Sequence, residues 1–274
     1  MTAPRLSVVT VVRDDLPGLL ATRASLCAQS WRDFEWIVVD GASTDGTAGW
    51  LAAHADEPAW WRSAPDGGTY DAMNVALEHA SGDFLLFLNA GDTLPGPDTL
   101  ATVAAALGAA PDADFLYGDA LERLGDGRTV LKPARSHRYA FYGMFTHHQA
   151  MVYRRALVAG LRYQTRFAIG ADYAFTLQAL ARARRVVRLP QPLCVFVAGG
   201  LSQRRAALGR REQTVIRREL MGLGFLSCAA ISGVQAVFAM VRRYLPPLYE
   251  KGRFRTRKDR FFYSRTPPVR LISG

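Results

Sequence analysis

Cysteine is scarce in this sequence, and the few cysteines that occur form no recognisable pattern. The 274 residues contain Cys27, Cys194 and Cys228. Their odd number and irregular spacing give no reason to expect a structural disulfide or a cysteine-bound metal, and favour reduced thiols in a cytosolic setting.

Several other signals are missing. The sequence has no G-x-G-x-x-G fingerprint and no G-x-x-x-x-G-K-[ST] loop, so neither an ordinary NAD enzyme nor an ATPase is indicated. It contains no internal repeat. The first apolar segment, residues 6–12, is too short for a secretory signal and is followed by Arg13-Asp14-Asp15, so it reads as a strand. With 49% hydrophobic residues the chain is able to bury a full core.

Acidic residues are scarce in the last quarter of the chain. Residues 201–274 contain 16 Lys/Arg and 4 Asp/Glu, a net charge of +12, which leaves residues 1–200 with 18 and 20, a net charge of −2. The overall charge of +10 therefore belongs to the tail alone. This asymmetry predicts that the tail meets an anionic surface while the first 200 residues do the chemistry.

The tail also contains 21 consecutive uncharged residues, Met221–Val241, between arginine pairs. Three interpretations are open: a helix or helical hairpin that dips into the cytoplasmic leaflet, a true membrane span, or a buried helix of the fold. The later sequence KGRFRTRKDRFFYSR interleaves cations with aromatic residues, as an interfacial anchor needs. No signature of a nucleic-acid-binding fold is present.

The first 200 residues alternate between strand and helix patterns. We predict a parallel α/β arrangement with right-handed crossovers. The expected strands are residues 6–12, 34–39, 84–88 and 115–117, and the expected helices are residues 16–29, 48–55, 70–80, 97–108 and 173–183.

Polar residues follow three of the predicted strands. The first ends at Arg13-Asp14, the second at Asp40, and the strand at 84–88 ends at Asn89-Ala90-Gly91-Asp92. In open α/β sheets ligands bind outside the carboxyl ends of the strands. An isolated Asp at such a point reads as a turn or capping residue, but three together predict one shared crevice.

Six ordered motifs carry a family resemblance: TVVRDD (10–15), VDGASTDGT (39–47), PDGGTYDAMN (65–74), FLNAGD (87–92), HHQAMVYRR (147–155) and GADYAF (170–175). Together they resemble family 2 glycosyltransferases over residues 5–203, in the branch that builds bacterial exopolysaccharide, capsule and lipopolysaccharide, similar to the colanic-acid type.

This resemblance implies a GT-A fold, an α/β architecture with a Rossmann-like mixed, mostly parallel sheet flanked by helices. The glycosyltransferase domain would span residues 1–205, followed by a helical, basic, membrane-associating region at 206–274. The implied reaction is transfer of one sugar from a nucleotide diphosphate donor, with inversion, to a lipid-linked or saccharide acceptor. The implied location is the cytoplasmic face of the bacterial inner membrane, with peripheral or monotopic attachment.

The resemblance also assigns the donor pocket. Asp40 would accept a hydrogen bond from the uracil ring, Thr10 and Asp14 would line the base and ribose pocket, and Asp66 would lie on the nucleotide's other side. Because a carboxylate can only accept, it selects the imide N–H of uracil or thymine over cytosine. A UDP-sugar is therefore favoured, and a dTDP-sugar stays possible.

A divalent cation, Mg²⁺ or Mn²⁺, is the natural stabiliser of the departing diphosphate. Asp92 is the candidate ligand, or alternatively a cap for the next helix. Asn89 and Gly91 stand where the commoner family motif has acids, so Asn89 is assigned to substrate binding rather than to the metal.

An inverting transfer needs a base for the acceptor hydroxyl, and Asp172 matches the position of the family's base. Its alternative role is an N-cap, and both roles are compatible because a helix N-terminus favours an ionised carboxylate.

Other residues complete the expected site. His148 and Gln149 are assigned to the acceptor or phosphates, although a structural histidine is an equal alternative, and Asp119 to the acceptor side. No Trp follows Gln203-Arg204-Arg205, so the Q-x-x-R-W box of processive synthases is missing and single-sugar transfer is expected. A sugar nucleotidyltransferase and a membrane-bound UDP-sugar sensor without activity remain as alternatives.

Overall fold

A mixed β-sheet with helices on both faces forms the centre of the protein. The computed structural model describes residues 6–200 and 204–244. Within these residues the sheet has eight strands in the order β3-β2-β1-β4-β7-β5-β6, with β8 alongside β5. The strands are β1 (Leu6–Val12), β2 (Phe34–Asp40), β3 (Trp60–Ser63), β4 (Phe84–Phe87), β5 (Phe115–Arg123), β6 (Thr129–Lys132), β7 (Met151–Arg154) and β8 (Val186–Val197).

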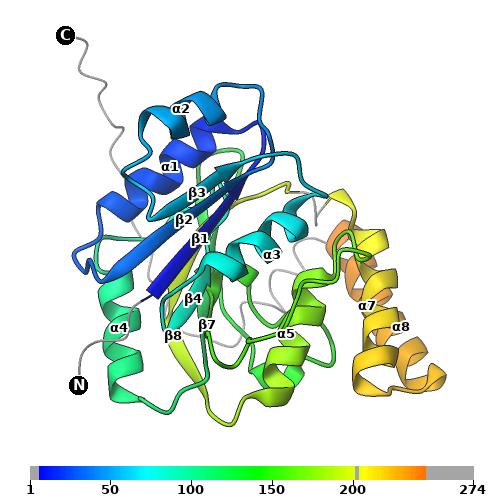
Figure 1. Ribbon diagram of the computed structural model, residues 1–274. Coiled ribbons are helices and arrows are strands. Elements are labelled where there is room, and N and C mark those ends of the chain that lie inside the picture. Colours follow the sequence, from blue (N-terminus) through cyan, green and yellow to red (C-terminus); the bar gives the residue numbers. More distant parts are fainter. Residues whose placement is uncertain (1–5, 201–203, 245–274) are drawn as a thin grey trace. The chain divides into compact units, whose positions relative to one another are not determined.

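The helices cover the two faces unequally. In Figure 1, α3 and α5 lie on one face of the sheet, and α1, α2 and α4 on the other. The helices are α1 (Leu16–Cys27), α2 (Thr47–Ala53), α3 (Thr69–His79), α4 (Thr99–Ala109), α5 (Ala171–Arg182), α7 (Ala206–Met221) and α8 (Phe225–Tyr244), with short 3₁₀ turns η1 (His137–Tyr139) and η2 (His148–Ala150).

The first half of the sheet is parallel and follows the predicted pattern. β1 pairs with both β2 and β4, and β2 with β3, all in parallel. Every residue of β1 is buried, which explains why its sequence is mostly apolar. Each predicted strand and helix in this half forms, with ends shifted by one or two residues.

Two layers of core hold the sheet between its helices. On the α3 side, Ala72, Met73 and Ala76 are buried at helical spacing and pack on one hydrophobic cluster. On the other side, Leu19 of α1 and Leu51 of α2 belong to a second cluster. The expected inward packing of Met73 is confirmed.

The second half of the sheet differs from the prediction at β5. We expected a strand at Phe115–Tyr117 that ended at Asp119, but β5 continues to Arg123. Its first residues pair with β7 and its last with β6, while β8 runs along its other side with register shifts around Asp119. The bulge keeps the strand paired beyond the turn-like residues Gly118 and Asp119.

Four strands gave too weak a signal to be predicted. β3, β6 and β7 have only four residues each, and β8 contains Pro190 and Pro192, which usually indicate a strand boundary. Because β8 pairs with β5 through an irregular register, the prolines fall where the ladder is interrupted.

The chain divides into two compact units, residues 1–224 and 225–274. Helix α7 belongs to the first, so the structural division comes after the expected boundary at 205. The uncharged run is not one helix: α7 ends at Met221, Gly222 forms its left-handed cap with φ of +63°, and α8 begins at Phe225. No helix in the described part of the chain is long and apolar enough to cross a membrane. The predicted anchor at 251–265 lies outside the described residues.

Candidate active site

The ends of β1, β2 and β4 meet at one edge of the sheet, as predicted. Val12 pairs with Asp40 in the parallel register, and Gly41 N donates to Val12 O at 2.9 Å. On the other side of β1, Ala90 N donates to Val11 O at 3.2 Å. The polar segments after the three strands therefore lie side by side.

Asp40 is fully buried, and its carboxylate accepts hydrogen bonds from inside the protein. The donors are Ser63 Oγ at 2.6 Å, Ser43 N at 3.1 Å and Ser43 Oγ. Asp14 lies on the neighbouring strand end, where its Oδ1 accepts from Thr44 N at 2.7 Å. The loop after β2 is thus fixed by carboxylates from two strands.

Asp66 lies against the end of β2. A Cβ atom on Gly41 would lie 2.8 Å from Asp66 Oδ2, so only glycine leaves room for this carboxylate. Asp66 Oδ1 accepts from Gly68 N at 2.8 Å, which holds the loop before α3. Two segments separated by more than 20 residues in sequence are in this way brought together beside Asp40.

Thr10 lies within the sheet, below the polar strand ends. Its side chain is fully buried on the α1 face of the sheet, where the hydroxyl donates to Leu88 O at 2.8 Å and accepts from Trp36 Nε1 at 2.9 Å. Both hydrogen bonds join neighbouring strands. The assignment of Thr10 to the wall of the nucleotide pocket is therefore corrected: its hydroxyl supports the strand ends from below.

Asp92 occupies a half-buried position next to Gln149. Burial raises the pKa of Asp92 to about 7, and the Gln149 side chain opposes this rise as a hydrogen-bond partner. The alternative role as a helix cap is wrong, because α4 begins at Thr99 and its N-cap is Asp98. The Asp92 carboxylate therefore does not cap the helix that follows it.

Two residues that contact Asp92 have a buried amide oxygen, namely Asn89 Oδ1 and Gln149 Oε1; Asn89 contacts Asp92 through its backbone carbonyl, and Gln149 through its side chain. Neither amide oxygen has a hydrogen-bond partner in the described part of the protein. Unpaired buried acceptors are costly, so they mark a place for a donor or a cation. Oxygen donors suit Mg²⁺ and Mn²⁺.

The protein provides only one acidic ligand at this point. Among residues 6–200 and 204–244, no three His, Cys, Asp or Glu side chains are grouped as a metal site. The donor set of Asp92 with Asn89 and Gln149 fits a hard cation whose other ligands are diphosphate oxygens and water.

The two adjacent histidines lie at the η2 turn, and their rings point to opposite faces of the sheet. His147 stacks on Phe196 with ring centroids 3.7 Å apart. His148 Nε2 lies 3.0 Å from Tyr163 Oη, within the aromatic cluster around Phe87. Burial lowers the pKa of His147 to about 4 and that of His148 to about 3, so both are neutral. His148 fits the structural alternative better than a substrate contact.

Asp172 lies in the first turn of α5 and is half-buried. Its Oδ1 accepts from Tyr173 N at 2.7 Å. Burial is the main cause that raises the pKa of Asp172 to about 7, and the negative charge of Glu212 adds to the rise. The N-cap of α5 is Gly170, so the capping alternative is wrong. A carboxyl group that titrates near neutral pH suits a general base.

Asp119 is buried within the fold. Its Oδ1 accepts from Ala134 N at 2.7 Å and lies 3.8 Å from Arg188 Nη2. These contacts fix the segment after β6 to β5. They do not support the expected contact with the acceptor.

Sequence reasoning missed the residues that tie α3 to the segment before α5. Tyr70 Oη donates to Ile169 O at 2.7 Å. Asn74 pairs with the backbone of Tyr163, donating to its carbonyl at 2.9 Å and accepting from its N–H at 2.7 Å. Both lie in the predicted PDGGTYDAMN motif, but only the structure shows what they contact. The motif thereby connects the Asp66 loop with Asp172.

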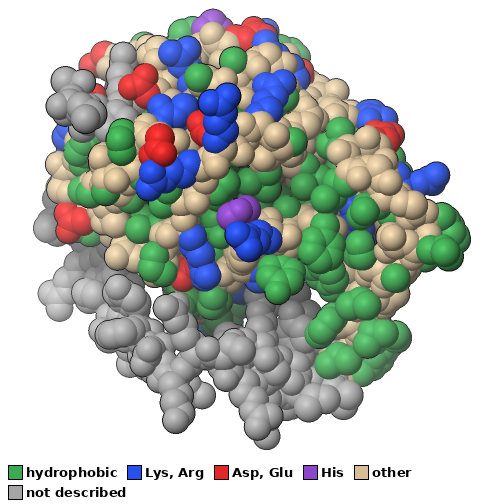
Figure 2. All heavy atoms as spheres, turned by 90° about the horizontal axis from the view of Figure 1, so that it is seen from below, with side chains coloured by type: hydrophobic (Ala, Val, Ile, Leu, Met, Phe, Trp, Pro, Cys, Tyr) green, Lys and Arg blue, Asp and Glu red, His purple; other side chains and the backbone are tan. Residues whose placement is uncertain are grey.

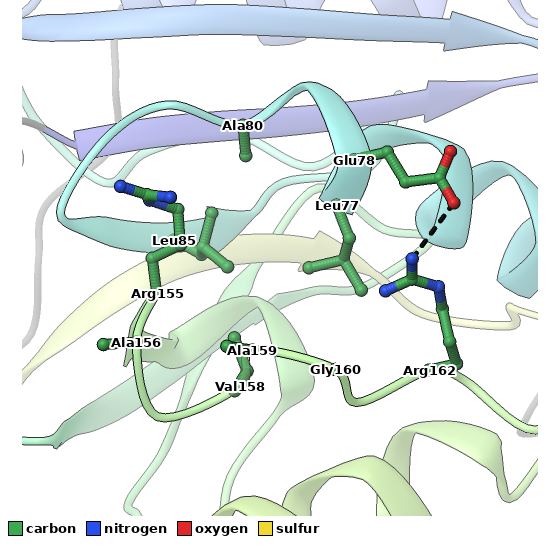
Figure 3. A pocket seen from close by; sticks show the side chains of 10 residues that line it. All are labelled: Leu77, Glu78, Ala80, Leu85, Arg155, Ala156, Val158, Ala159, Gly160 and Arg162. Carbon is green, nitrogen blue, oxygen red and sulfur yellow. Dashed lines mark hydrogen bonds and ion pairs between the residues drawn. The ribbon is translucent and has the colours of Figure 1, made fainter.

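A partly open cavity of about 250 Å³ lies at the other end of β4. Figure 3 shows Leu85, near the start of β4, among its lining residues, with Glu78 and Arg162 joined by an ion pair. Asn89 follows the opposite end of the same strand. This cavity is therefore separate from the polar strand ends.

Comparison with known proteins agrees with these observations. The sequence is 37% identical over 229 residues to an uncharacterized glycosyltransferase of Mycobacterium tuberculosis, covering 82% of this chain and 85% of that protein. It is 32% identical over 263 residues to the PGL/p-HBAD biosynthesis glycosyltransferase of Mycobacterium bovis, covering 89% and 92%. These relatives do not single out the colanic-acid type, so that part of the resemblance is not supported.

Solved structures show the same fold at low sequence identity. Staphylococcus aureus TarS 1-349 in complex with UDP-GlcNAc has a TM-score of 0.64 at 21% identity, covering 90% of this chain and 77% of that one. The chain spans 42% of the longer TarS structure. The mannosyltransferase PcManGT from Pyrobaculum calidifontis, in complex with GDP-Man and Mn²⁺, has a TM-score of 0.62 at 20% identity, covering 92% and 80%.

A family profile decides the classification. The profile of Glycosyl transferase family 2 matches residues 7–171, which include the three strand ends and the start of α5. The protein therefore has a GT-A-like fold and transfers sugar from a nucleotide sugar. This chain belongs to Glycosyl transferase family 2.

Proposed function

We propose that this protein transfers one hexosyl or N-acetylhexosaminyl unit from a UDP-sugar to a saccharide or lipid-linked acceptor, with inversion at the anomeric carbon. The observation that carries the proposal is that one motif links two sets of carboxylates. Asp40 and Asp66 lie at the end of β2, which we call the nucleotide edge, and Tyr70 of the same motif as Asp66 contacts the segment just before Asp172, whose pKa burial raises to about 7. The first set suits a nucleotide, and the second suits proton transfer.

The proposed reaction needs a single proton transfer. Asp172 accepts the proton of the acceptor hydroxyl as its oxygen forms a bond to the anomeric carbon. The bond between that carbon and the diphosphate breaks, and UDP leaves with the electron pair. Because attack and departure occur on opposite faces, the configuration inverts.

Asp92, with the amide oxygens of Asn89 and Gln149, would hold Mg²⁺ or Mn²⁺ beside the diphosphate. When bound, the cation supplies positive charge that offsets the charge developing on the leaving group. The PcManGT complex with GDP-Man and Mn²⁺ supports this assignment by analogy of fold.

We further propose that the protein works at the cytoplasmic face of the bacterial inner membrane, in exopolysaccharide, capsule, lipopolysaccharide or glycolipid synthesis. Support comes from a groove of about 740 Å³ whose lining combines Phe141, Leu220 and Met221 with Arg138 and Arg184. Figure 2 shows hydrophobic side chains beside Lys and Arg on the face seen from below. Such a combination suits anionic lipid headgroups.

A sedimentation experiment tests the membrane assignment. Full-length protein is mixed with phosphatidylcholine vesicles that contain or lack phosphatidylglycerol. We expect sedimentation with the anionic vesicles alone, and its loss as salt rises, because screening weakens exposed charges. Protein that stays in the supernatant with both vesicle types contradicts the assignment.

One observation favours a second function. Since Asp92 is the only acid in the Asn89–Asp92 motif, the chain is a candidate UDP-sugar sensor without turnover. Incubation with UDP-glucose, UDP-galactose and UDP-N-acetylglucosamine plus Mn²⁺ separates the two: release of UDP supports the transferase. Thermal stabilisation by UDP without UDP release from any donor supports the sensor.

A further inference from the structure

Helix α7 lies outside the region that the family profile matches, yet it packs directly on the segment before Asp172. Its residues Gly209, Glu212 and Ile216 follow helical spacing and face the same way. A Cβ atom on Gly209 would lie 3.0 Å from Ile169, and one on Gly170 would lie 2.9 Å from Ile216. The contact is therefore close along the whole face.

Glu212 makes the polar contact in the middle of this face. Its Oε1 accepts from Ala168 N at 2.9 Å, and its Oε2 accepts from Ile169 N at 2.9 Å and Gly170 N at 2.7 Å. Glu212 is 9% exposed. Three charge-assisted hydrogen bonds to consecutive N–H groups fix the path of the chain two residues before Asp172.

A second buried residue anchors α7 further along the helix. Arg217 is fully buried, and it donates from Nε to Phe141 O at 2.7 Å and from Nη2 to Tyr142 O at 2.6 Å. Its guanidinium also lies 6.0 Å from the ring centroid of Tyr173, the residue after Asp172. Helix α7 thus contacts residues 168–170, which precede Asp172, and Tyr173, which follows it.

We propose that Glu212 is a positioning residue for Asp172, and that α7 is for this reason part of the active site. The inference rests on the proposed role of Asp172 as base. Glu212 acts through two effects: its hydrogen bonds set where the Asp172 carboxylate points, and its charge makes that carboxylate a stronger base.

The electrostatic effect follows from the groups around Asp172. Tyr70 from α3, Tyr153 from β7, Tyr163 and Glu212 all interact with it. Burial raises the pKa of the three tyrosines, so they are neutral at physiological pH. Of these four neighbours, Glu212 is the one that carries charge, and a like charge nearby disfavours ionisation of Asp172.

Two substitutions separate position from charge. Glu212→Gln keeps the length but removes the charge, whereas Glu212→Asp keeps the charge but shortens the reach. Glu219→Gln is the matched control, because Glu219 lies on the same helix and pairs with Arg166 at an exposed position. All variants are made in the full chain.

The main measurement is the pH dependence of kcat for UDP-sugar hydrolysis, with UDP affinity measured in parallel. Glu212→Gln should lower kcat ten- to hundredfold and move the acidic limb of the profile to lower pH. Glu212→Asp should lower kcat but leave the acidic limb of the profile at the same pH. The affinity for UDP should change less than twofold in Glu212→Gln and in Glu212→Asp. A purely structural role would lower thermal stability without moving the limb, and that result overturns the proposal.

Hydrogen exchange tests the contact without any need for turnover. Amides of residues 168–175 should exchange faster in Glu212→Gln than in the parent or in Glu219→Gln. Unchanged exchange overturns the proposal even if the enzyme is active. If the parent releases no UDP from any donor but the exchange rises as expected, the proposed function fails while the contact stands.

Discussion

The candidate site contains two pairs of carboxylates that differ in their surroundings inside the protein: Asp40 and Asp66, the nucleotide edge, and Asp92 and Asp172, which we call the transfer edge. At the nucleotide edge, Asp40 accepts from Ser43 and Ser63, and Asp66 from Gly68. At the transfer edge, burial raises the pKa of Asp92 and Asp172 to about 7. The first group stabilises the shape of the pocket, whereas the second keeps its capacity for a proton or a cation.

The largest expected effect comes from the transfer edge. Asp172→Asn should reduce UDP-sugar turnover about a thousandfold, because an amide cannot accept the proton of the acceptor hydroxyl. UDP affinity, measured by calorimetry, should stay within twofold. Asp98→Asn, which changes an exposed acid at the start of α4, serves as the control. If turnover in Asp172→Asn equals that of the parent, Asp172 is not the base and the transfer edge has no special role.

The other acid of the transfer edge should show a different defect. Asp92→Asn should lower turnover about a hundredfold by weakening cation binding beside the diphosphate. Added Mn²⁺ should strengthen UDP binding to the parent but not to the variant, as measured by calorimetry. If Mn²⁺ strengthens UDP binding equally in both, Asp92 is not a cation ligand.

The nucleotide edge should respond through affinity instead of turnover. In Gly41→Ala the new methyl group would meet Asp66 at 2.8 Å and displace its carboxylate. We expect UDP to bind about tenfold more weakly, a loss of about 1.4 kcal/mol. Gly49→Ala is the matched control, since a Cβ there has nothing within 4 Å. Equal affinities in the two variants would contradict a role for Asp66 at the nucleotide.

The sequence predicted the nucleotide edge well because its parts are local. An apolar strand followed by a polar turn is visible in VDGAS and FLNAGD, and parallel pairing necessarily brings such ends together. It could not show that Thr10 faces the helix layer, because that depends on which face of β1 each residue occupies in the folded sheet.

The support of the transfer edge was beyond sequence reasoning because it is long-range. Glu212 contacts residues more than 40 positions away, and Asn74 contacts Tyr163 across 89. A weak signal did exist, since Glu212 is one of four acids among residues 201–274. An isolated acid in a basic helix suggests a buried contact with another part of the chain, but the sequence does not identify that part. The irregular pairing of β5 with β8 was hidden for the same reason.

The smallest effect we expect is on the melting temperature of the protein without substrate, where the two edges should respond differently to pH. Because burial raises the folded-state pKa of Asp172 to about 7, the folded protein binds the proton more tightly than the unfolded chain, where an Asp titrates near 4. Ionisation of Asp172 therefore costs stability as pH rises from about 4 to about 7. Asp172→Asn removes this cost, so its melting temperature should exceed that of the parent by a few degrees at pH 8 and match it near pH 4.5.

At the nucleotide edge, Asp40→Asn should lower the melting temperature at both pH values, because the fully buried carboxylate loses hydrogen bonds that an amide cannot all replace. Differential scanning calorimetry at the two pH values measures both variants, and a pH-independent effect of Asp172→Asn would mean that the two edges do not differ as we infer.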